Sequence, residues 1–122
     1  MRRWAPMAAA LLAAGCGEGS APARTIAGAE AERGLAVIRR EGCAACHVVP
    51  AVNWPEGGAG PSLKGFAASP LIAGRLPNRP DVLTAWLIDP PSLAPGTAMP
   101  PASITEAEAR DVAAFLYTLD DR

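Results

Sequence analysis

The sequence predicts an all-α domain, in which three main helices are joined by long irregular segments. Three segments repeat apolar residues every three to four positions, and no segment alternates apolar and polar residues as a half-buried strand does. Only 5% of the 122 residues are aromatic, whereas Gly and Pro contribute 12 and 13 residues. A domain this small and poor in aromatic residues fills its core with difficulty, so we expect a disulfide, a metal or a cofactor to help.

The first predicted helix runs from about Ala29 to Glu41. Leu35 and Ile38 lie on its apolar face, and Gly42 follows as a residue suited to a left-handed helix end. Gly34 lies inside this helix and costs about 1 kcal/mol relative to alanine. Such a glycine is tolerated where another backbone or a ring must approach closely.

The other two helices are predicted from capping residues and periodicity. The second spans about Arg79 to Ile88, with Asn78 as its N-cap and Pro90 as its stop. The third begins at Thr105, which forms a capping box with Glu108, and continues to about Leu119. From residue 48 to 80 no period is sustained, and we expect an irregular stretch that wraps a large rigid body.

The N-terminal segment is typical of an exported protein. Arg2 and Arg3 precede a short apolar run over 5–14, which is shorter than the roughly 20 residues that span a bilayer. The small residues leading into Cys16 resemble a bacterial lipobox, which implies a lipidated Cys16; the alternative is an ordinary secretory leader. We therefore expect a signal peptide over 1–15, a lipid-anchored flexible tether over 16–28 and a folded domain over 29–122.

The charges of the chain exclude nucleic-acid binding. Basic and acidic residues number 11 and 12, the formal net charge is −1, and Lys64 is the only lysine. Without a cluster of Lys and Arg, no surface can follow a phosphate backbone.

The chemistry is concentrated in the C-x-x-C-H motif of Cys43, Cys46 and His47. This spacing is typical of a c-type haem, in which the two thiols form thioethers and the histidine binds the iron. Three other interpretations remain open. A zinc site needs a fourth ligand, a thioredoxin-like redox pair needs a βαβ context, and a structural disulfide is compatible with export.

Elimination indicates the second axial ligand of such a haem. His47 is the only histidine, and Met1 and Met7 lie in the leader, which leaves Met99. The prolines on both sides of Met99 stiffen its loop, so that a thioether is held there at low entropic cost. Methionine opposite histidine raises the reduction potential and suits electron transfer.

Over residues 29–120 the sequence resembles a class I, single-haem cytochrome c. A helix leading into the C-x-x-C-H motif is the first feature of that family. The motifs that follow in order are Gly60-Pro61-Ser62-Leu63, the segment Leu83 to Pro90, the loop Pro95 to Pro100, and a terminal amphipathic helix.

The resemblance implies a fold of three main helices and long loops around one covalently bound haem c. It further implies that Cys43 and Cys46 hold the haem and that His47 and Met99 are the axial ligands. The Pro61 carbonyl would accept a hydrogen bond from His47. The haem walls would come from Leu63, Trp86 and Leu87.

Two further expectations concern neighbouring residues. The resemblance implies that the first and last helices cross at Gly34, with Phe115 packed against it. The candidates for binding the haem propionates are Trp54, Arg75, Asn78 and Thr97.

The function implied is that of a one-electron carrier, not an enzyme, on the periplasmic side of a bacterial membrane. Its donor would be a quinol-oxidising complex or a dehydrogenase, and its acceptor a terminal oxidase or reductase. Two alternatives are a haem-based sensor or enzyme for a gas or peroxide, and a fixed haem subunit of a larger oxidoreductase.

Overall fold

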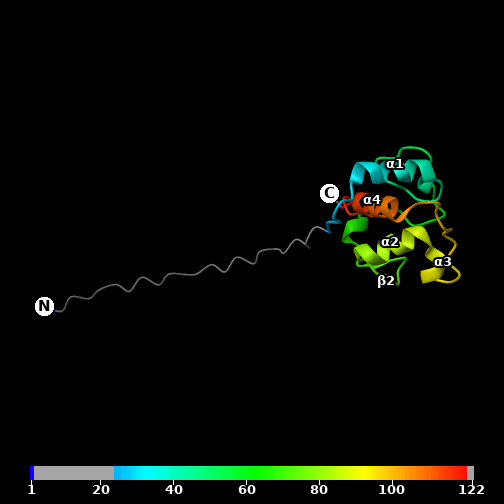
Figure 1. Cartoon of the computed structure of the whole chain (residues 1–122). Helices are drawn as coiled ribbons and strands as arrows, with labels where there is room; N and C mark the ends of the chain where they lie inside the picture. Colours follow the sequence, from blue (N-terminus) through cyan, green and yellow to red (C-terminus); the bar gives the residue numbers. More distant parts are fainter. Residues whose placement is uncertain (2–23, 121–122) are drawn as a thin grey trace.

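The computed structural model describes Met1 and residues 24–120, and helix α4 lies at the centre of the fold (Figure 1). Helix α1 packs on one side of α4 and helix α2 on the other. The helices are α1 (Ala31–Glu41), α2 (Pro80–Ile88), α3 (Pro90–Leu93) and α4 (Glu106–Leu116). Two 3₁₀ turns, η1 (Cys43–Ala45) and η2 (Phe66–Ala68), and two short strands, β1 (Leu71–Ile72) and β2 (Leu76–Pro77), complete the described elements.

Helix α1 crosses α4 at Gly34, as expected. A Cβ atom at Gly34 would collide with the backbone carbonyl of Asp111, so the two helices approach closely only because this residue lacks a side chain. The atoms nearest to that position belong to Asp111 and Val112, whereas Phe115, expected at the crossing, is buried in the core one turn further along α4. Gly42 ends α1 in the left-handed conformation, with φ of 70°.

The ends of the two long helices differ slightly from the prediction. Helix α1 begins at Ala31 rather than Ala29, and the backbone N–H of Glu30, the residue before the helix, donates to Oδ1 of Asp111 at 2.7 Å. The predicted capping box of α4 is present, with Glu108 N–H donating to Oγ1 of Thr105 at 3.2 Å. This helix ends at Leu116, and the chain continues in a turn that still buries Leu119.

The second predicted helix is present, but its N-cap was predicted wrongly. The residue before α2 is Arg79, and its side chain makes no capping bond. Asn78 is instead buried at 5% exposure, and its side-chain amide donates to the carbonyls of Ser69 and Phe66 at 2.9 and 3.3 Å. Its Oδ1 accepts a hydrogen bond from the Tyr117 hydroxyl at 3.0 Å, so Asn78 joins the irregular stretch to the end of α4.

The prolines after α2 do not only stop it. Pro90 and Pro91 also begin α3, because proline fits the first turn of a helix, where its missing N–H has no partner to lose.

The stretch from 48 to 80 is more ordered than expected. It contains η2 and an antiparallel pair in which Leu71 aligns with Pro77 and Ile72 with Leu76.

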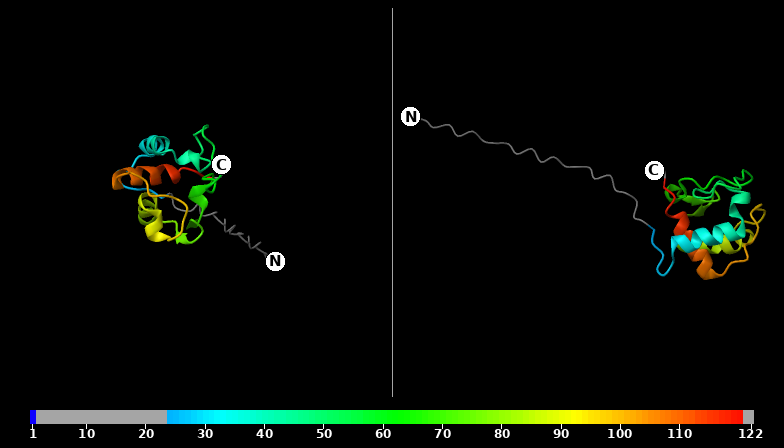
Figure 2. Two further views of the ribbon diagram at one scale, coloured as in Figure 1. Left: turned by 90° about the vertical axis from the view of Figure 1, so that its right-hand side faces the viewer. Right: turned by 90° about the horizontal axis from the view of Figure 1, so that it is seen from above.

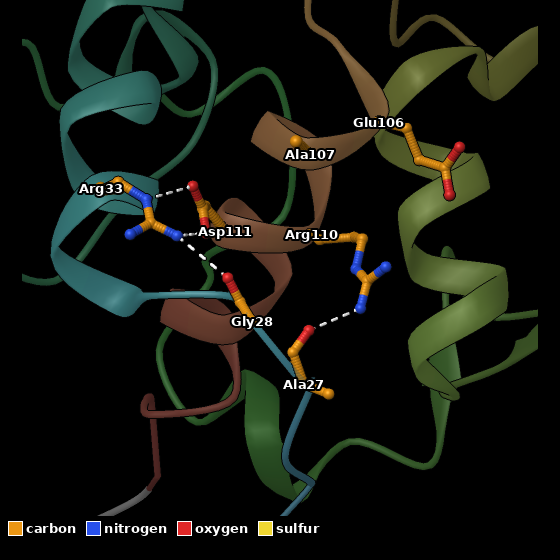
Figure 3. Close-up of a pocket in the computed structure, with 7 residues that line it drawn as sticks. All are labelled: Ala27, Gly28, Arg33, Glu106, Ala107, Arg110 and Asp111. Carbon is orange, nitrogen blue, oxygen red and sulfur yellow. Dashed lines mark hydrogen bonds and ion pairs between the residues drawn. The ribbon is translucent and has the colours of Figure 1, made fainter.

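The segment 24–28, which the sequence assigns to a flexible tether, packs on the domain. Arg24 donates to the carbonyl of Ala67 at 2.7 Å, and its guanidinium lies 5.1 Å from the centre of the Tyr117 ring. Ile26 packs against the core, and Arg110 donates to the Ala27 carbonyl at 2.6 Å (Figure 3). The segment makes these contacts through the guanidinium of Arg24, the apolar side chain of Ile26 and the carbonyl of Ala27. The remainder of the predicted tether and the predicted signal peptide after Met1 lie outside the described residues.

The segment before α1 and the end of the described chain lie at the same end of the fold (Figure 2). Helix α1 runs from this end of the fold to the opposite end, where it leads directly into η1. No helix among the described residues is long and apolar enough to cross a membrane. One apolar cluster, formed by residues of α1, α2 and α4 and of the segments between the helices, fills the space between these three helices.

Candidate haem-binding site

The C-x-x-C-H motif forms a tight turn directly after α1. The N–H of Cys46 and the N–H of His47 both donate to the Cys43 carbonyl, at 3.2 and 3.1 Å. Cys43 is half-buried and packs against the core, whereas Cys46 is exposed, and both are free thiols. Burial raises the pKa of the Cys43 thiol above its ordinary value. The turn therefore presents two reduced thiols and the imidazole from one short segment.

The imidazole of His47 is oriented by a backbone carbonyl. Its Nδ1 lies 2.6 Å from the carbonyl oxygen of Pro61. Because a carbonyl only accepts hydrogen bonds, Nδ1 carries a proton, and in the neutral ring Nε2 keeps its lone pair. Among the described residues no hydrogen bond engages Nε2. The ring is thus held in the tautomer that a metal ligand requires.

Two glycines let the following loop lie against this turn. A Cβ atom at Gly60 would lie 2.5 Å from Cε1 of His47, and one at Gly57 would collide with the carbonyl of Ala45. The loop is fixed by three backbone bonds, in which Gly57, Gly60 and Leu63 donate to Ala44, Cys46 and Val48 at 2.9, 2.7 and 2.9 Å. The sequence places Gly57 in an irregular stretch and Gly60 in the Gly60-Pro61-Ser62-Leu63 motif, but it indicates no packing role for either. Their role depends on contacts across the loop that no local pattern records.

Met99 lies in a loop that begins at the end of α3. The N–H of Thr97 donates to the Ala94 carbonyl at 3.1 Å, and the N–H of Met99 lies 3.4 Å from Oγ1 of Thr97. Met99 is partly buried against the apolar cluster that contains Trp86 and Leu87. Leu63 and Cys43 border the same cluster. The predicted wall residues, one thiol and the candidate ligand Met99 therefore share one apolar region.

The alternatives to a haem site find no support in the geometry. Cys43 and Cys46 do not form a disulfide. Within the part of the chain that the structure describes, no three His, Cys, Asp or Glu side chains gather as a metal site. The fold around the motif is helical and contains no βαβ unit in the described residues.

The expected propionate partners differ in their surroundings. Both amide hydrogens of Asn78 are used by the carbonyls of Phe66 and Ser69, which leaves no donor for a carboxylate. The Thr97 hydroxyl faces the N–H of Met99, whereas Arg75 is exposed. Trp54 is 85% exposed on the loop after the motif. The structure thus argues against Asn78 as a propionate ligand.

A cavity of about 420 Å³ lies at the other end of α1 (Figure 3). Arg33 there binds both carboxylate oxygens of Asp111, at 2.8 and 2.9 Å, and donates to the Gly28 carbonyl at 3.1 Å. The Arg33 guanidinium holds the pKa of the Asp111 carboxyl below its usual value. Helix α1 has 11 residues and is about 16 Å long, so this cavity is separate from the His47 site. Its polar groups join the N-terminal segment to α1 and α4.

Comparison with known proteins decides the family. The cytochrome c family model matches residues 31–120, which include the motif, the Pro61 loop and Met99. The chain belongs to the cytochrome c family. It therefore carries covalently attached haem c and is an electron-transfer haem protein. Its fold is similar to that of cytochrome cH from Methylobacterium extorquens, with a TM-score of 0.51 and 28% identity over 73% of this chain and 98% of that one.

One relative places the same domain within a larger protein. The chain is 34% identical over 90 residues to cytochrome c oxidase subunit 2 of Alkalihalophilus pseudofirmus. That match covers 73% of this chain but 25% of the relative, so the chain spans about a quarter of that protein's length. The free thiols, the available Nε2 of His47 and the space kept by Gly60 fit the haem c that the family carries.

Proposed function

We propose that this protein is a one-electron carrier of an extracytoplasmic respiratory chain and is not an enzyme. The observation that carries the proposal is the hydrogen bond between Nδ1 of His47 and the carbonyl of Pro61. It fixes a proton on Nδ1 and leaves Nε2 as the ligand atom, which is the arrangement found around metal-binding histidines.

The proposed haem site uses the residues of the motif and of two loops. Cys43 and Cys46 attach the haem, and His47 and Met99 are its axial ligands. Pro61 orients His47. The apolar walls are Leu63, Trp86 and Leu87, of which Trp86 and Leu87 are buried in the core and Leu63 packs against it.

Haem c supplies a one-electron redox couple, and the protein keeps that couple in a fixed environment. The Pro61 carbonyl prevents rotation of the His47 ring, and the loop before Met99 is tied by its own backbone bonds. Methionine opposite histidine raises the reduction potential. If His47 and Met99 both bind the iron, no ligand position would be left for oxygen or peroxide, which would favour a carrier over a sensor or an enzyme.

The cellular setting of the proposal rests on the leader. We propose that Cys16 is lipidated and that the protein faces the periplasm from a bacterial membrane. Two or more acyl chains are enough for stable anchoring. Replacement Cys16→Ser should release haem-loaded protein into the soluble periplasmic fraction. An unmodified N-terminus at another position in the wild-type protein, measured by mass spectrometry, would contradict lipidation.

The relative named cytochrome c oxidase subunit 2 favours a terminal oxidase as the acceptor. The proposed donor is a quinol-oxidising complex or a dehydrogenase. The same relative supports a second candidate function, in which the chain is a fixed haem subunit beside its oxidase. Stable co-purification of the membrane-extracted protein with copper or haem subunits would favour the fixed subunit. Purification of the protein alone, with full electron transfer when it is added back to membranes, would favour the free carrier.

The decisive experiment tests Met99 as the sixth ligand. The reduced wild-type protein should bind carbon monoxide poorly at neutral pH, and the oxidised protein should show the weak near-infrared band of a sulfur ligand. Met99→Ala should permit carbon monoxide binding and lower the reduction potential. Met99→His, which restores a ligand, should again exclude carbon monoxide while keeping the potential low. Rapid carbon monoxide binding by the wild-type protein would instead support the sensor or enzyme.

A further inference from the structure

Trp54 is a large apolar side chain that the fold leaves in solvent. It is 85% exposed, whereas the other large apolar side chains exposed among residues 24–120, Leu71 and Leu93, are 42% and 36% exposed. A tryptophan side chain buries a large area when it is covered, and it is among the commonest anchors of protein interfaces. Covering the Trp54 indole would therefore remove more apolar surface from water than covering either leucine.

The loop that carries Trp54 is fastened on both sides. Before it, the N–H of Val52 donates to the Val49 carbonyl at 3.0 Å, and Arg39 donates from α1 to the carbonyl of Ala51 at 3.1 Å. After it, the N–H of Gly57 donates to the Ala44 carbonyl at 2.9 Å. A side chain held out by such a loop loses little entropy on binding, because the loop is already ordered.

The loop also lies beside the proposed electron-transfer site. Ala44, to which Gly57 bonds, lies between the two cysteines of the motif, and Gly60 of the same loop lies against the His47 ring. The N-terminal segment contacts the opposite end of α1, about 16 Å along the helix (Figure 1). The loop that carries the exposed indole thus lies against the C-x-x-C-H turn, far from the end of α1 where the N-terminal segment contacts the domain.

Charge gives this surface little steering power. Arg40 on the last turn of α1 is paired with Glu41 and Glu108 at 2.9 and 2.8 Å. Arg39 keeps its charge while it donates to the Ala51 carbonyl, and the exposed Glu56, two residues after Trp54, carries the opposite charge, so the charges around the loop are of mixed sign. A partner that docks here is recognised by apolar contact rather than by a field of one sign.

We propose that Trp54 is the apolar anchor through which this protein docks on its redox partner. The inference rests on the proposed carrier function and extends it. The partner is a protein with an uncharged apolar recess beside its own electron entry or exit site. The indole inserts into that recess, and the C-x-x-C-H turn is thereby brought against the partner.

The test compares haem-loaded wild-type protein with Trp54→Ala, Trp54→Phe and the matched control Leu71→Ala. The probe is membrane vesicles from the source bacterium that lack this protein. Oxygen uptake with ascorbate as reductant reports the acceptor, and reduction of the protein by NADH in the presence of cyanide reports the donor. Trp54→Ala should raise KM about tenfold in at least one reaction without changing kcat. Trp54→Phe should recover part of that loss, and Leu71→Ala should behave as wild type.

The salt dependence is a second expectation. The KM of the wild-type protein should change less than about threefold between 50 and 300 mM salt, since apolar contacts are not screened. The reduction potential and the visible spectrum of Trp54→Ala should match those of the wild type. A strong salt dependence that is the same in Trp54→Ala would show that charges dock the partner, and would overturn the proposal.

Other occupants of the surface predict different results. If Trp54 binds the haem, its replacement shifts the potential or spectrum and leaves KM unchanged. If it binds a membrane, Cys16→Ser protein binds lipid vesicles and Trp54→Ala abolishes that binding. If it contacts a second copy, Trp54→Ala dissociates a dimer without affecting KM. Each outcome overturns the docking proposal. If the wild-type protein is active and Trp54→Ala has the same KM, only the docking proposal is overturned. If the wild-type protein is inactive in both reactions, the proposed function is overturned as well.

Discussion

The crossing of α1 and α4 and the loop around His47 are held together in different ways. At the crossing, the contacts join side chains and backbones of two regular helices, and the one carboxylate of Asp111 accepts hydrogen bonds from both Glu30 and Arg33. Around His47, the chain is irregular from Gly57 to Leu63, and three backbone bonds and two missing side chains set its position.

The crossing therefore contributes mainly to the stability of the fold, whereas the loop mainly sets the orientation of His47. Regular helices satisfy their own backbone groups, so the crossing can be specified by one small residue and one ion pair. An irregular loop must find partners for its buried N–H and C=O groups, and here three of its N–H groups donate to the turn that carries the cysteines or to Val48 just after it. A change at the crossing should therefore alter folding, whereas a change in the loop should alter the orientation of His47.

The largest expected effect tests the crossing. Gly34→Ala places a methyl group against the Asp111 carbonyl, and neither backbone can move without displacing its helix. The gain in helix propensity, about 1 kcal/mol, is too small to compensate. We expect a loss of about 3 kcal/mol in the free energy of unfolding, measured by denaturant titration of the haem-loaded protein.

The matched control for this substitution is Gly58→Ala. A Cβ atom at Gly58 meets no other atom within 4 Å, and its φ is not in the left-handed region. Its stability should equal that of the wild type within error. Equal stabilities for Gly34→Ala and Gly58→Ala would mean that the helices do not approach each other as closely as the structure shows.

An intermediate effect is expected in the loop. Gly60→Ala brings a methyl group to 2.5 Å from Cε1 of His47, so the imidazole or the loop must shift. We expect a loss of about 2 kcal/mol in stability. Gly60→Ala should also shift the reduction potential, because displacing the imidazole would distort the hydrogen bond from Nδ1 of His47 to Pro61. Gly34→Ala should leave the potential unchanged. Voltammetry of both variants would separate the two regions.

The same division explains which features the sequence could predict. The periodic apolar residues of α1 and α4, the capping box at Thr105 and the stop at Gly42 are local patterns, and all are present. The motif and the Pro61 loop were equally recognisable, and the bond from His47 to Pro61 agrees with the family resemblance. The axial and wall roles of the remaining site residues stay predictions.

Features that depend on distant partners were missed. Asn78 has the composition of an N-cap, but its side chain is taken by Ser69 and Tyr117, which are 9 and 39 positions away. Arg24 lies in a stretch with the composition of a linker, yet it contacts Ala67 and Tyr117. Neither contact leaves a periodic signal in the sequence, because each depends on how the helices place the loops.

The smallest expected effect concerns the ion pair at the crossing. In Asp111→Asn the side chain keeps an acceptor for Glu30 or Arg33, but it loses the charge and one of the oxygen atoms. Hydrogen bonds to a charged acceptor are stronger than those to a neutral one, so we expect a loss of about 1 kcal/mol at pH 7. The exposed carboxylate of Asp81, which pairs with Arg79, serves as control, and Asp81→Asn should leave stability at pH 7 unchanged.

The pH dependence of that loss tests its cause. The pKa of Asp111 is lowered in the folded protein, mainly by the hydrogen bond from Arg33, from the ordinary value of 3.8. Its contribution is therefore complete above pH 3.8 and is lost as the pH falls through the lowered pKa. Denaturant titrations should show a constant difference between wild type and Asp111→Asn from pH 7 to 5, and a shrinking one below the ordinary value. A difference that stays constant in acid would mean that shape rather than charge joins α1 to α4, and the two regions would then be held together by the same kind of contact.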